Sequence, residues 1–351
     1  MQKRVGNVEE ILSYKTEMES NGDIQSFLGT TMLWTVLILL ICGALQYAWI
    51  LYEDKYAIQP SNYKEGFVDT GAVTESEHTR ITWFENDELF DEFYASVYDN
   101  LTQLASRYPQ EISLIMQQWK KKAEAGTMEI LDCGCGTGMA TIFFAKQNVK
   151  SIVGLDSSRS MIRRAKTVTV VAANITREQR ETIQFIDGDM HVESTFSGGQ
   201  FSHAAVLFFT IYYSTDPVGL FKNLFFWLRP GGSLAVEVVN KYKFDPILEA
   251  ASPFSGVSLQ KYSKKRITKS KVEFDTFSYE AEFDLQDPAA EFREVFRFKD
   301  KSVRRQRHTM NMRDINGFID LAVSTGWKYV GFVDLLTAGF EYAYVLIFSH
   351  P

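Results

Sequence analysis

The sequence predicts an α/β fold, a seven-stranded sheet with helices on both faces. Between residues 128 and 190, three short apolar runs lead into acids and alternate with segments of helical periodicity. The first run ends at Asp132, and glycines follow at every second position, Gly134, Gly136 and Gly138. Alternation of buried strands and helices is typical of α/β proteins, and a glycine-rich turn between strand and helix is typical of a ligand site.

Length and composition describe a chain that can bury a sizeable core. The 351 residues are 45% hydrophobic and 23% charged, which are ordinary values for globular proteins. The net charge of −7 argues against a specific nucleic-acid partner, because neutralising phosphates requires clustered lysine and arginine. Cys133 and Cys135 lie too close together for a zinc knuckle and lack a second pair, so no metal site is expected.

The amino-terminal part of the sequence predicts a membrane anchor. From Ile24 to Tyr52 no aspartate, glutamate, lysine or arginine occurs. Roughly 20 apolar residues span the hydrocarbon of a bilayer, and Trp34 and Tyr52 lie near the ends of the run, as interfacial aromatic residues do. We therefore expect a polar segment at 1–27, a transmembrane helix at 28–52 and a linker at 53–84, with a buried core helix as the alternative to the anchor.

The glycine turn predicts a nucleotide-like ligand. Glycines remove the Cβ atoms that would keep a ligand away from the backbone, and the helix after the turn points free N–H groups at it. The sequence does not match the dinucleotide fingerprint G-x-G-x-x-G, because Met139 or Thr141 occupies the position of its third glycine. It does not match a phosphate-binding P-loop either, because no lysine follows the turn before Lys146.

The motif Asp-x-Gly-x-Gly-x-Gly at 132–138 resembles the first motif of the class I S-adenosylmethionine-dependent methyltransferases, near their type 11 group. The resemblance covers about residues 85–350, and it implies a Rossmann-like methyltransferase domain at 85–351 with S-adenosylmethionine as cofactor. It further implies that Asp189 accepts a hydrogen bond from the adenine amino group, with Met161 and Met190 near the ring. Asp156, 18 residues beyond Gly138, is placed to accept hydrogen bonds from both ribose hydroxyls.

A helical pattern with aromatic residues runs from Leu89 to Leu101 ahead of the glycine turn. In the resembling family such a helix covers the cofactor, so Tyr94 and Tyr98 are candidate lid residues; a helix that simply packs on the domain is the alternative. The expected cofactor-binding residues are Asp132, Gly134, Cys135, Gly136, Gly138, Asp156, Ser157, Met161, Asp189, Met190, Tyr94 and Tyr98.

Beyond Asn240 the pattern changes to strict alternation, which predicts an antiparallel insertion at 245–312 between the fifth and sixth strands of the sheet. Strands are expected at 277–285, 292–298 and 304–312. The resemblance implies that this insertion builds the acceptor pocket. A helix at 314–324 and strands at 326–332 and 342–348 complete the expected domain.

Methyl transfer from a sulfonium is an in-line displacement, so the protein mainly positions donor and acceptor and excludes water. A base is needed only if the nucleophile must lose a proton. Tyr213, Asn240 and His308 are the candidates near the carboxyl ends of the strands, where ligands bind in open α/β sheets.

A tethered enzyme favours an acceptor at the membrane surface: a lipid, a quinone-like ring or a neighbouring protein. A soluble metabolite and a non-catalytic, cofactor-binding scaffold are the alternatives. Charge does not orient the anchor, because only Lys15 precedes it closely and Lys55 and Lys64 follow it. A cofactor made in the cytosol requires a catalytic domain that faces the cytosol, so we expect a single-pass membrane protein in that orientation.

Overall fold

The structure, a computed structural model, describes residues 80–248, 250, 260 and 263–351, which belong to one compact unit of the chain, 75–351. The expected polar segment at 1–27, the transmembrane helix at 28–52 and most of the linker lie outside the described residues. In the part that the structure describes, no helix is both long and apolar enough to cross a membrane.

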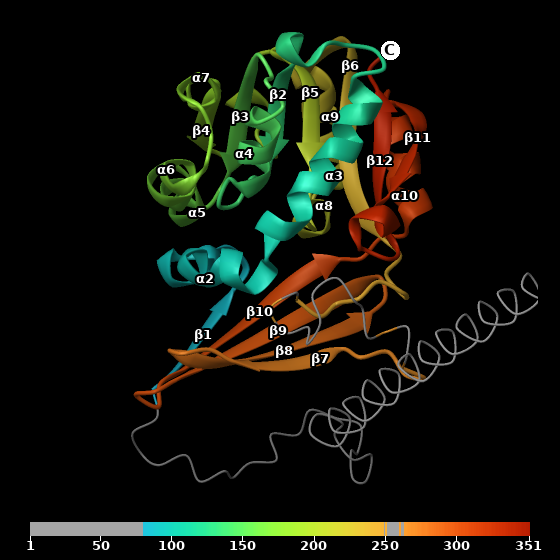
Figure 1. Cartoon of the computed structure of the whole chain (residues 1–351). Helices are drawn as coiled ribbons and strands as arrows, with labels where there is room; N and C mark the ends of the chain where they lie inside the picture. The colour runs from blue at the N-terminus through green and yellow to red at the C-terminus, as the bar shows by residue number, and fades with distance from the viewer. Residues whose placement is uncertain (1–79, 249, 251–259, 261–262) are drawn as a thin grey trace, which may run out of the picture. The chain divides into compact units, whose positions relative to one another are not determined.

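The expected seven-stranded sheet is confirmed, with the strand order β11-β12-β6-β5-β2-β3-β4 (Figure 1). Within this sheet the strands β2 to β6 run parallel, and β12 is antiparallel to both of its neighbours. The strands are β2 (Glu129–Cys133), β3 (Ser151–Asp156), β4 (Ile183–Asp187), β5 (Phe201–Val206), β6 (Leu228–Val239), β11 (Lys328–Asp334) and β12 (Ala343–Ser349). In this order the glycine turn follows β2, which lies between β5 and β3 inside the sheet, where a crevice for a ligand is expected.

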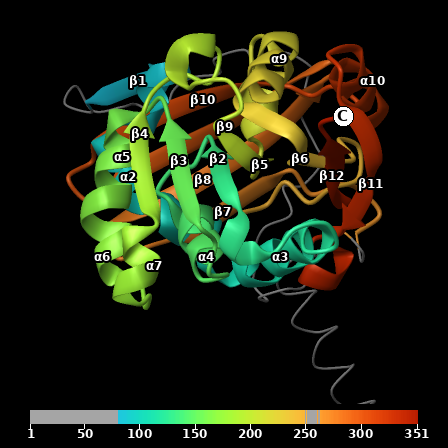
Figure 2. The same ribbon diagram turned by 90° about the horizontal axis from the view of Figure 1, so that it is seen from above.

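Helices cover both faces of this sheet, as Figure 2 shows: α3 (Leu104–Trp119) and α4 (Met139–Ala145) on one face, and α9 (Pro217–Trp227) and α10 (Ile315–Ser324) on the other. Large aromatic side chains fill the layers between helices and sheet. Trp119 of α3 stacks on Phe144 of α4 with 5.6 Å between ring centroids. The shorter helices α5 (Arg159–Arg164), α6 (Val170–Ala172) and α7 (Arg177–Glu181) lie between β3 and β4 in the chain.

A second sheet has the strand order β1-β10-β9-β8-β7. Its strands are β1 (Ile81–Glu85), β7 (Lys269–Glu273), β8 (Phe277–Gln286), β9 (Ala289–Phe298) and β10 (Val303–Asn311). The four strands β7 to β10 are antiparallel neighbours and lie within the range expected for the insertion. The inward face of β8 is apolar at every second residue, as the alternation in the sequence predicts.

Strand β1 shortens the linker expected at 53–84, because residues 81–84 belong to this strand. They pair in parallel with β10 and form the edge of the second sheet. Arg307 of β10 donates to Glu85 Oε1 at 2.7 Å, and the Arg304 guanidinium lies 3.8 Å from the centroid of the Phe84 ring. A strand this short and mixed in polarity carries no clear period, so only its distant partner identifies it.

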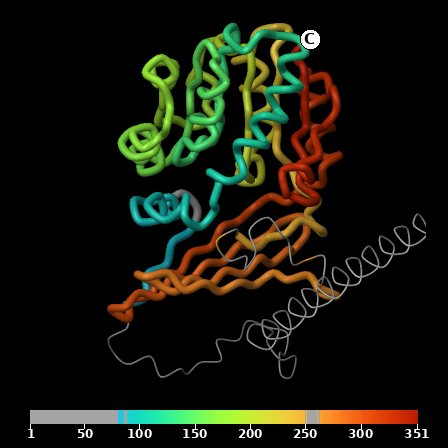
Figure 3. The backbone as a smooth tube through the Cα atoms, viewed as in Figure 1, coloured from blue at the N-terminus to red at the C-terminus, as the bar shows by residue number. Residues whose placement is uncertain are grey.

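The second sheet lies across from the carboxyl ends of the parallel strands, as the tube in Figure 3 shows. Two helices join the layers. Helix α8 (Thr210–Tyr213), which follows β5, packs on β10, and helix α2 (Glu92–Thr102) packs on α5. The glycine turn, α2, α8 and the inward face of β9 and β10 therefore meet in one region.

Candidate active site

The three glycines of the turn all have a positive φ, but they serve different purposes. A Cβ atom at Gly134 would collide with the side chain of Thr210, and one at Gly138 would lie 2.6 Å from Phe185. Packing within the protein therefore requires both glycines. At Gly136, with φ +54°, the nearest atom would be Tyr98 Cε1 at 3.9 Å. Only the backbone at Gly136 is open to a ligand that lies flat against it.

Asp156, at the tip of β3, is bound to the glycine turn. Its Oδ2 accepts from the N–H of Gly136 at 2.8 Å, and its Oδ1 accepts from the N–H of Ser158 at 2.9 Å. Burial raises the pKa of this carboxyl, while the two backbone hydrogen bonds oppose the shift. Each oxygen can accept a second hydrogen bond, so Asp156 can also receive two hydroxyl groups of a ribose. Ser157 is exposed beside it. These residues fit a nucleoside.

Asp132 lies beneath the turn rather than at its open side. Its side chain is 1% exposed, and its Oδ2 accepts from the hydroxyl of Thr141 at 2.5 Å. Burial raises its pKa to about 7. Asp132 therefore ties β2 to α4. Two other expected ligand residues also point inward: Cys135 packs with Phe185, and Met161 packs with residues of α2 and the second sheet.

Asp189 is positioned by a short chain of polar side chains. Its Oδ1 accepts from the N–H of His191 at 2.8 Å and lies 3.0 Å from His191 Nδ1; His191 Nε2 lies 2.9 Å from Ser214 Oγ. This arrangement resembles a hydrolytic triad, but Ser214 is 1% exposed and cannot reach a substrate. It fixes the loop after β4 to the end of α8. Met190, in the same loop, is partly buried against the core, and its carbonyl accepts from Asn223 at 3.0 Å.

Helix α2 is docked on the glycine turn as a cover. The hydroxyl of Thr137, inside the turn, donates to Asp99 at 2.5 Å. Tyr98 packs edge-on against Phe208, with centroids 6.4 Å apart, and lies nearest to Gly136. Tyr94, one turn earlier, faces the second sheet and donates to Glu294 at 3.2 Å. The structure thus gives the two candidate lid residues different neighbours.

Two of the three candidate bases are brought together. The hydroxyl of Tyr213 lies 2.8 Å from His308 Nδ1, and His308 Nε2 lies 2.6 Å from Glu294 Oε2. Asn240 is not part of this group, because its side-chain oxygen accepts from the N–H of Tyr242 at the end of β6. Sequence reasoning missed Glu294, although it shares the apolar face of β9 with Phe296 and therefore signals a buried acid.

Glu294 is a buried carboxylate with several partners. The hydroxyl of Tyr279 donates to its Oε1 at 2.5 Å and the Gln306 amide donates to its Oε2 at 2.5 Å. Burial alone would raise its pKa, but the charge of His308 and the hydrogen bonds outweigh burial, so the pKa is lowered. Glu294 therefore remains ionised beside His308.

The turn between β5 and α8 has a strained backbone and is held by a buried ionic cluster. Phe208 and Phe209 have φ values of +41° and +65°, a conformation that costs about 1–3 kcal/mol per residue. The N–H of Phe208 donates to Glu237 Oε2 at 2.6 Å, and Glu237 is paired with Arg107, which also donates to Glu111 at 2.8 Å. This buried ionic cluster holds α8 in place at the turn.

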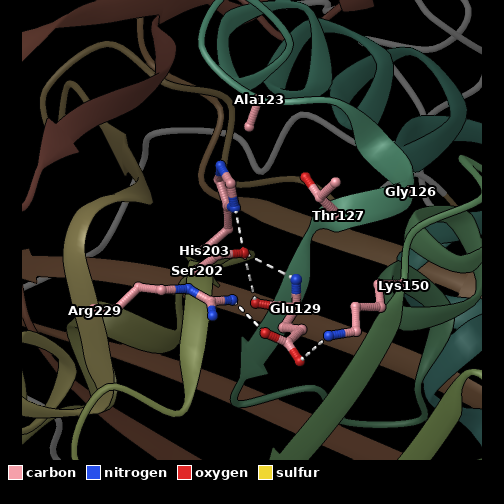
Figure 4. Close-up of a pocket in the computed structure, with 8 residues that line it drawn as sticks. All are labelled: Ala123, Gly126, Thr127, Glu129, Lys150, Ser202, His203 and Arg229. Carbon is pink, nitrogen blue, oxygen red and sulfur yellow. Dashed lines mark hydrogen bonds and ion pairs between the residues drawn. The ribbon is translucent and has the colours of Figure 1, made fainter.

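A pocket of about 400 Å³ opens at the other end of the sheet, at the amino ends of β2 and β5 (Figure 4). Its charged groups pair with one another, since Glu129 forms ion pairs with Lys150 at 3.0 Å and with Arg229. His203 lies in its wall and is hydrogen bonded to Ser202 at 2.8 Å. Ligands of open α/β sheets bind at the carboxyl ends of the strands, so we assign the site to the glycine turn and not to this pocket.

Comparison with known proteins identifies the class. The family described as "Methyltransferase domain" matches residues 100–279, just over half of the chain. The chain belongs to this family. Its residues 100–279 therefore belong to a methyltransferase domain of the S-adenosylmethionine-dependent kind.

Individual relatives match less of the chain. Cycloartenol-C-24-methyltransferase 1 of Oryza sativa subsp. japonica is 31% identical over 109 residues, which cover 31% of this chain and 30% of that protein. Carboxy-S-adenosyl-L-methionine synthase of Sulfurimonas denitrificans is 29% identical over 99 residues, 27% of this chain and 42% of that protein. The chain spans less than two thirds of the length of the curated relatives it matches.

Among solved structures, the CcbJ methyltransferase of Streptomyces caelestis is similar, with a TM-score of 0.56 and 14% identity over 76% of this chain and 99% of that one. At this identity the similarity concerns the fold.

Proposed function

We propose that this chain transfers the methyl group of S-adenosylmethionine to an acceptor at or near a membrane surface: a lipid, a quinone-like ring or a protein. The observation that carries the proposal is the stretch from Ile24 to Tyr52 without aspartate, glutamate, lysine or arginine, which precedes the methyltransferase domain in the same chain. Anchoring at 28–52 raises the local concentration of membrane acceptors around the site. The catalytic domain faces the cytosol in this proposal, because its cofactor is made there.

Aromatic side chains packed around His308 and Tyr213 support an acceptor with an apolar or planar body. Phe90 packs against Tyr213 and against His308, with centroids 5.8 Å and 5.9 Å apart. Tyr94 and Phe292 contact the same imidazole at 5.7 Å and 5.6 Å. Rings of this kind bind apolar and aromatic ligands well.

The test uses the full chain in membranes supplied with donor labelled in the methyl group. We expect label in the lipid or membrane-protein fraction, and a loss of at least tenfold when Leu37→Arg and Leu40→Arg are combined, because each central arginine opposes insertion by about 2.5–3.5 kcal/mol. Ser61→Arg, a charge outside the apolar run, is the matched control and should leave transfer unchanged.

Label that appears only in soluble metabolites would contradict the membrane acceptor. No label in any fraction, together with intact donor binding, would favour the scaffold alternative.

A further inference from the structure

The group formed by Tyr213, His308 and Glu294 lies next to the glycine turn, and two sets of contacts connect them. Helix α8 begins at Thr210, whose hydroxyl donates to the carbonyl of Gly134 at 3.4 Å, and Tyr213 lies one helical turn further on. On the other side, Tyr98 lies over Gly136 and packs edge-on against Tyr94, whose hydroxyl reaches Glu294. The group is thus next to the place where the cofactor residues converge.

The three side chains differ in accessibility. His308 and Glu294 are each 1% exposed, whereas Tyr213 is only partly buried. Tyr213 is therefore the member that an acceptor can touch. The hydroxyls of Tyr94 and Tyr279 and the Gln306 amide all donate hydrogen bonds to the Glu294 carboxylate. His308 can therefore receive a proton from Tyr213, the partner on its other ring nitrogen.

We infer that Tyr213, His308 and Glu294 form a proton relay that removes a proton from the reacting hydroxyl or amine of the methyl acceptor. This inference deepens the proposed function, on which it rests, by naming the chemistry of the acceptor's reacting group. Tyr213 is the catalytic residue, His308 receives the proton, and Glu294 is a positioning residue that acts through His308.

The proton transfer follows from the hydrogen bonds. With the His308 proton on Nε2 and donated to Glu294, Nδ1 accepts from the Tyr213 hydroxyl. The acceptor's O–H or N–H bond breaks, its proton passes to the Tyr213 oxygen, and the proton of Tyr213 passes to Nδ1. The electron pair left on the acceptor forms the new bond to the methyl carbon. The bound donor supplies that methyl group and keeps the electron pair of its carbon–sulfur bond.

The charges balance at the end of this step. The positive charge of the sulfonium is lost, and a positive charge appears on the His308 imidazolium, where Glu294 neutralises it. Burial, together with the Glu294 charge, raises the pKa of Tyr213, so its hydroxyl gives up a proton only as it receives another. The imidazolium then returns its proton to solvent through the Tyr213 hydroxyl before the next turnover.

The first test needs neither cofactor nor acceptor. The full chain contains five histidines, which can be labelled with ¹⁵N in the imidazole and observed by nuclear magnetic resonance in detergent micelles. His308→Gln assigns the His308 signals. Tyr213→Phe should move the Nδ1 signal of His308 and leave the other histidines in place, whereas Tyr329→Phe on β11, away from the site, should move none of them. An unchanged Nδ1 signal in Tyr213→Phe would overturn the relay.

The second test measures transfer from labelled donor to a panel of phenols and primary amines in detergent. Tyr213→Phe and His308→Gln should each lower kcat by about 100-fold, with KM and the donor's Kd nearly unchanged, and Tyr329→Phe should match the unaltered chain. Glu294→Gln should also lower kcat. The loss should fall on kcat and not on KM or donor binding, which a purely structural role would not produce.

The outcomes separate this inference from the membrane proposal. Full kcat in Tyr213→Phe would overturn the relay whatever the natural acceptor is. Transfer to neither class of probe, with donor binding intact, would overturn the acceptor class named here. A membrane assay that fails while the probes are methylated through Tyr213 would contradict only the membrane location.

Discussion

The carboxylate of Asp156 accepts a hydrogen bond of 2.8 Å from the backbone N–H of Gly136. This bond joins the tip of β3 to the one glycine of the turn that is open to a ligand. The same carboxylate therefore shapes the turn and keeps lone pairs that can accept hydrogen bonds from a ligand.

We expect Asp156→Ala to weaken the binding of S-adenosylmethionine by at least about tenfold, because the variant loses the acceptor of two hydroxyl groups and the support of Gly136. Calorimetry on the full chain measures the affinity. Asp187→Ala is the control, since Asp187 ends the neighbouring strand β4 but pairs at the surface with Arg159. Undiminished affinity in Asp156→Ala would remove the assignment of the ribose site.

Gly134→Ala and Gly136→Ala should fail in different ways. Both positions have positive φ, so both variants carry a backbone cost of about 1–2 kcal/mol. Only at Gly134 does the new methyl group also collide with Thr210. Thermal unfolding should therefore show a much lower Tm for Gly134→Ala, while Gly136→Ala should fold but lose cofactor affinity. The reverse pattern would show that the ligand does not lie over Gly136.

Glu237→Gln should destabilise the domain by about 1.5–3 kcal/mol, because the buried Arg107 keeps only Glu111 as a charged partner and the N–H of Phe208 loses its carboxylate acceptor. Urea unfolding of the variant measures the free energy. Glu129→Gln is the matched control: Glu129 also pairs with an arginine but is 24% exposed, and a pair of that kind contributes about 0–1 kcal/mol. Equal effects of the two substitutions would contradict the role given to the buried cluster.

Acid should destabilise the domain partly through His203. Burial lowers the pKa of His203 to about 4, below its unfolded value near 6.5. The unfolded chain therefore binds more protons between these values, and stability rises with pH across that window and is lost as pH falls through it. The contribution is up to about 3 kcal/mol. His203→Gln should flatten this part of the stability curve, measured by urea unfolding at pH 4.5 and 7, whereas His350→Gln should leave it in place.

Local patterns account for what the sequence could predict. The acids Asp132 and Asp156 and the three glycines lie within 25 residues of one another, and each belongs to a strand end or turn with its own signature. The alternation in the insertion was equally local. These features therefore predicted the sheet, the cofactor and the position of Asp156 at the turn.

Distant contacts account for what the sequence could not predict. The hydrogen bond between Tyr213 and His308 spans 95 residues, and the one between Tyr94 and Glu294 spans 200. The inward orientation of Asp132 depends on Thr141 across the turn, and the packing of Gly134 depends on Thr210. Such contacts can be identified only from the folded structure, because most of them form between segments that are far apart in the sequence.

Strand β1 has a practical consequence for work with shortened chains. Its residues 81–85 occupy one side of β10, in register with 303–307. A fragment that begins at residue 86 would still hold every motif that marks the family. It would also expose a row of unpaired N–H and C=O groups on β10, the strand that carries His308, and such an edge is a template for aggregation. Soluble fragments for biochemistry should therefore begin ahead of Ile81.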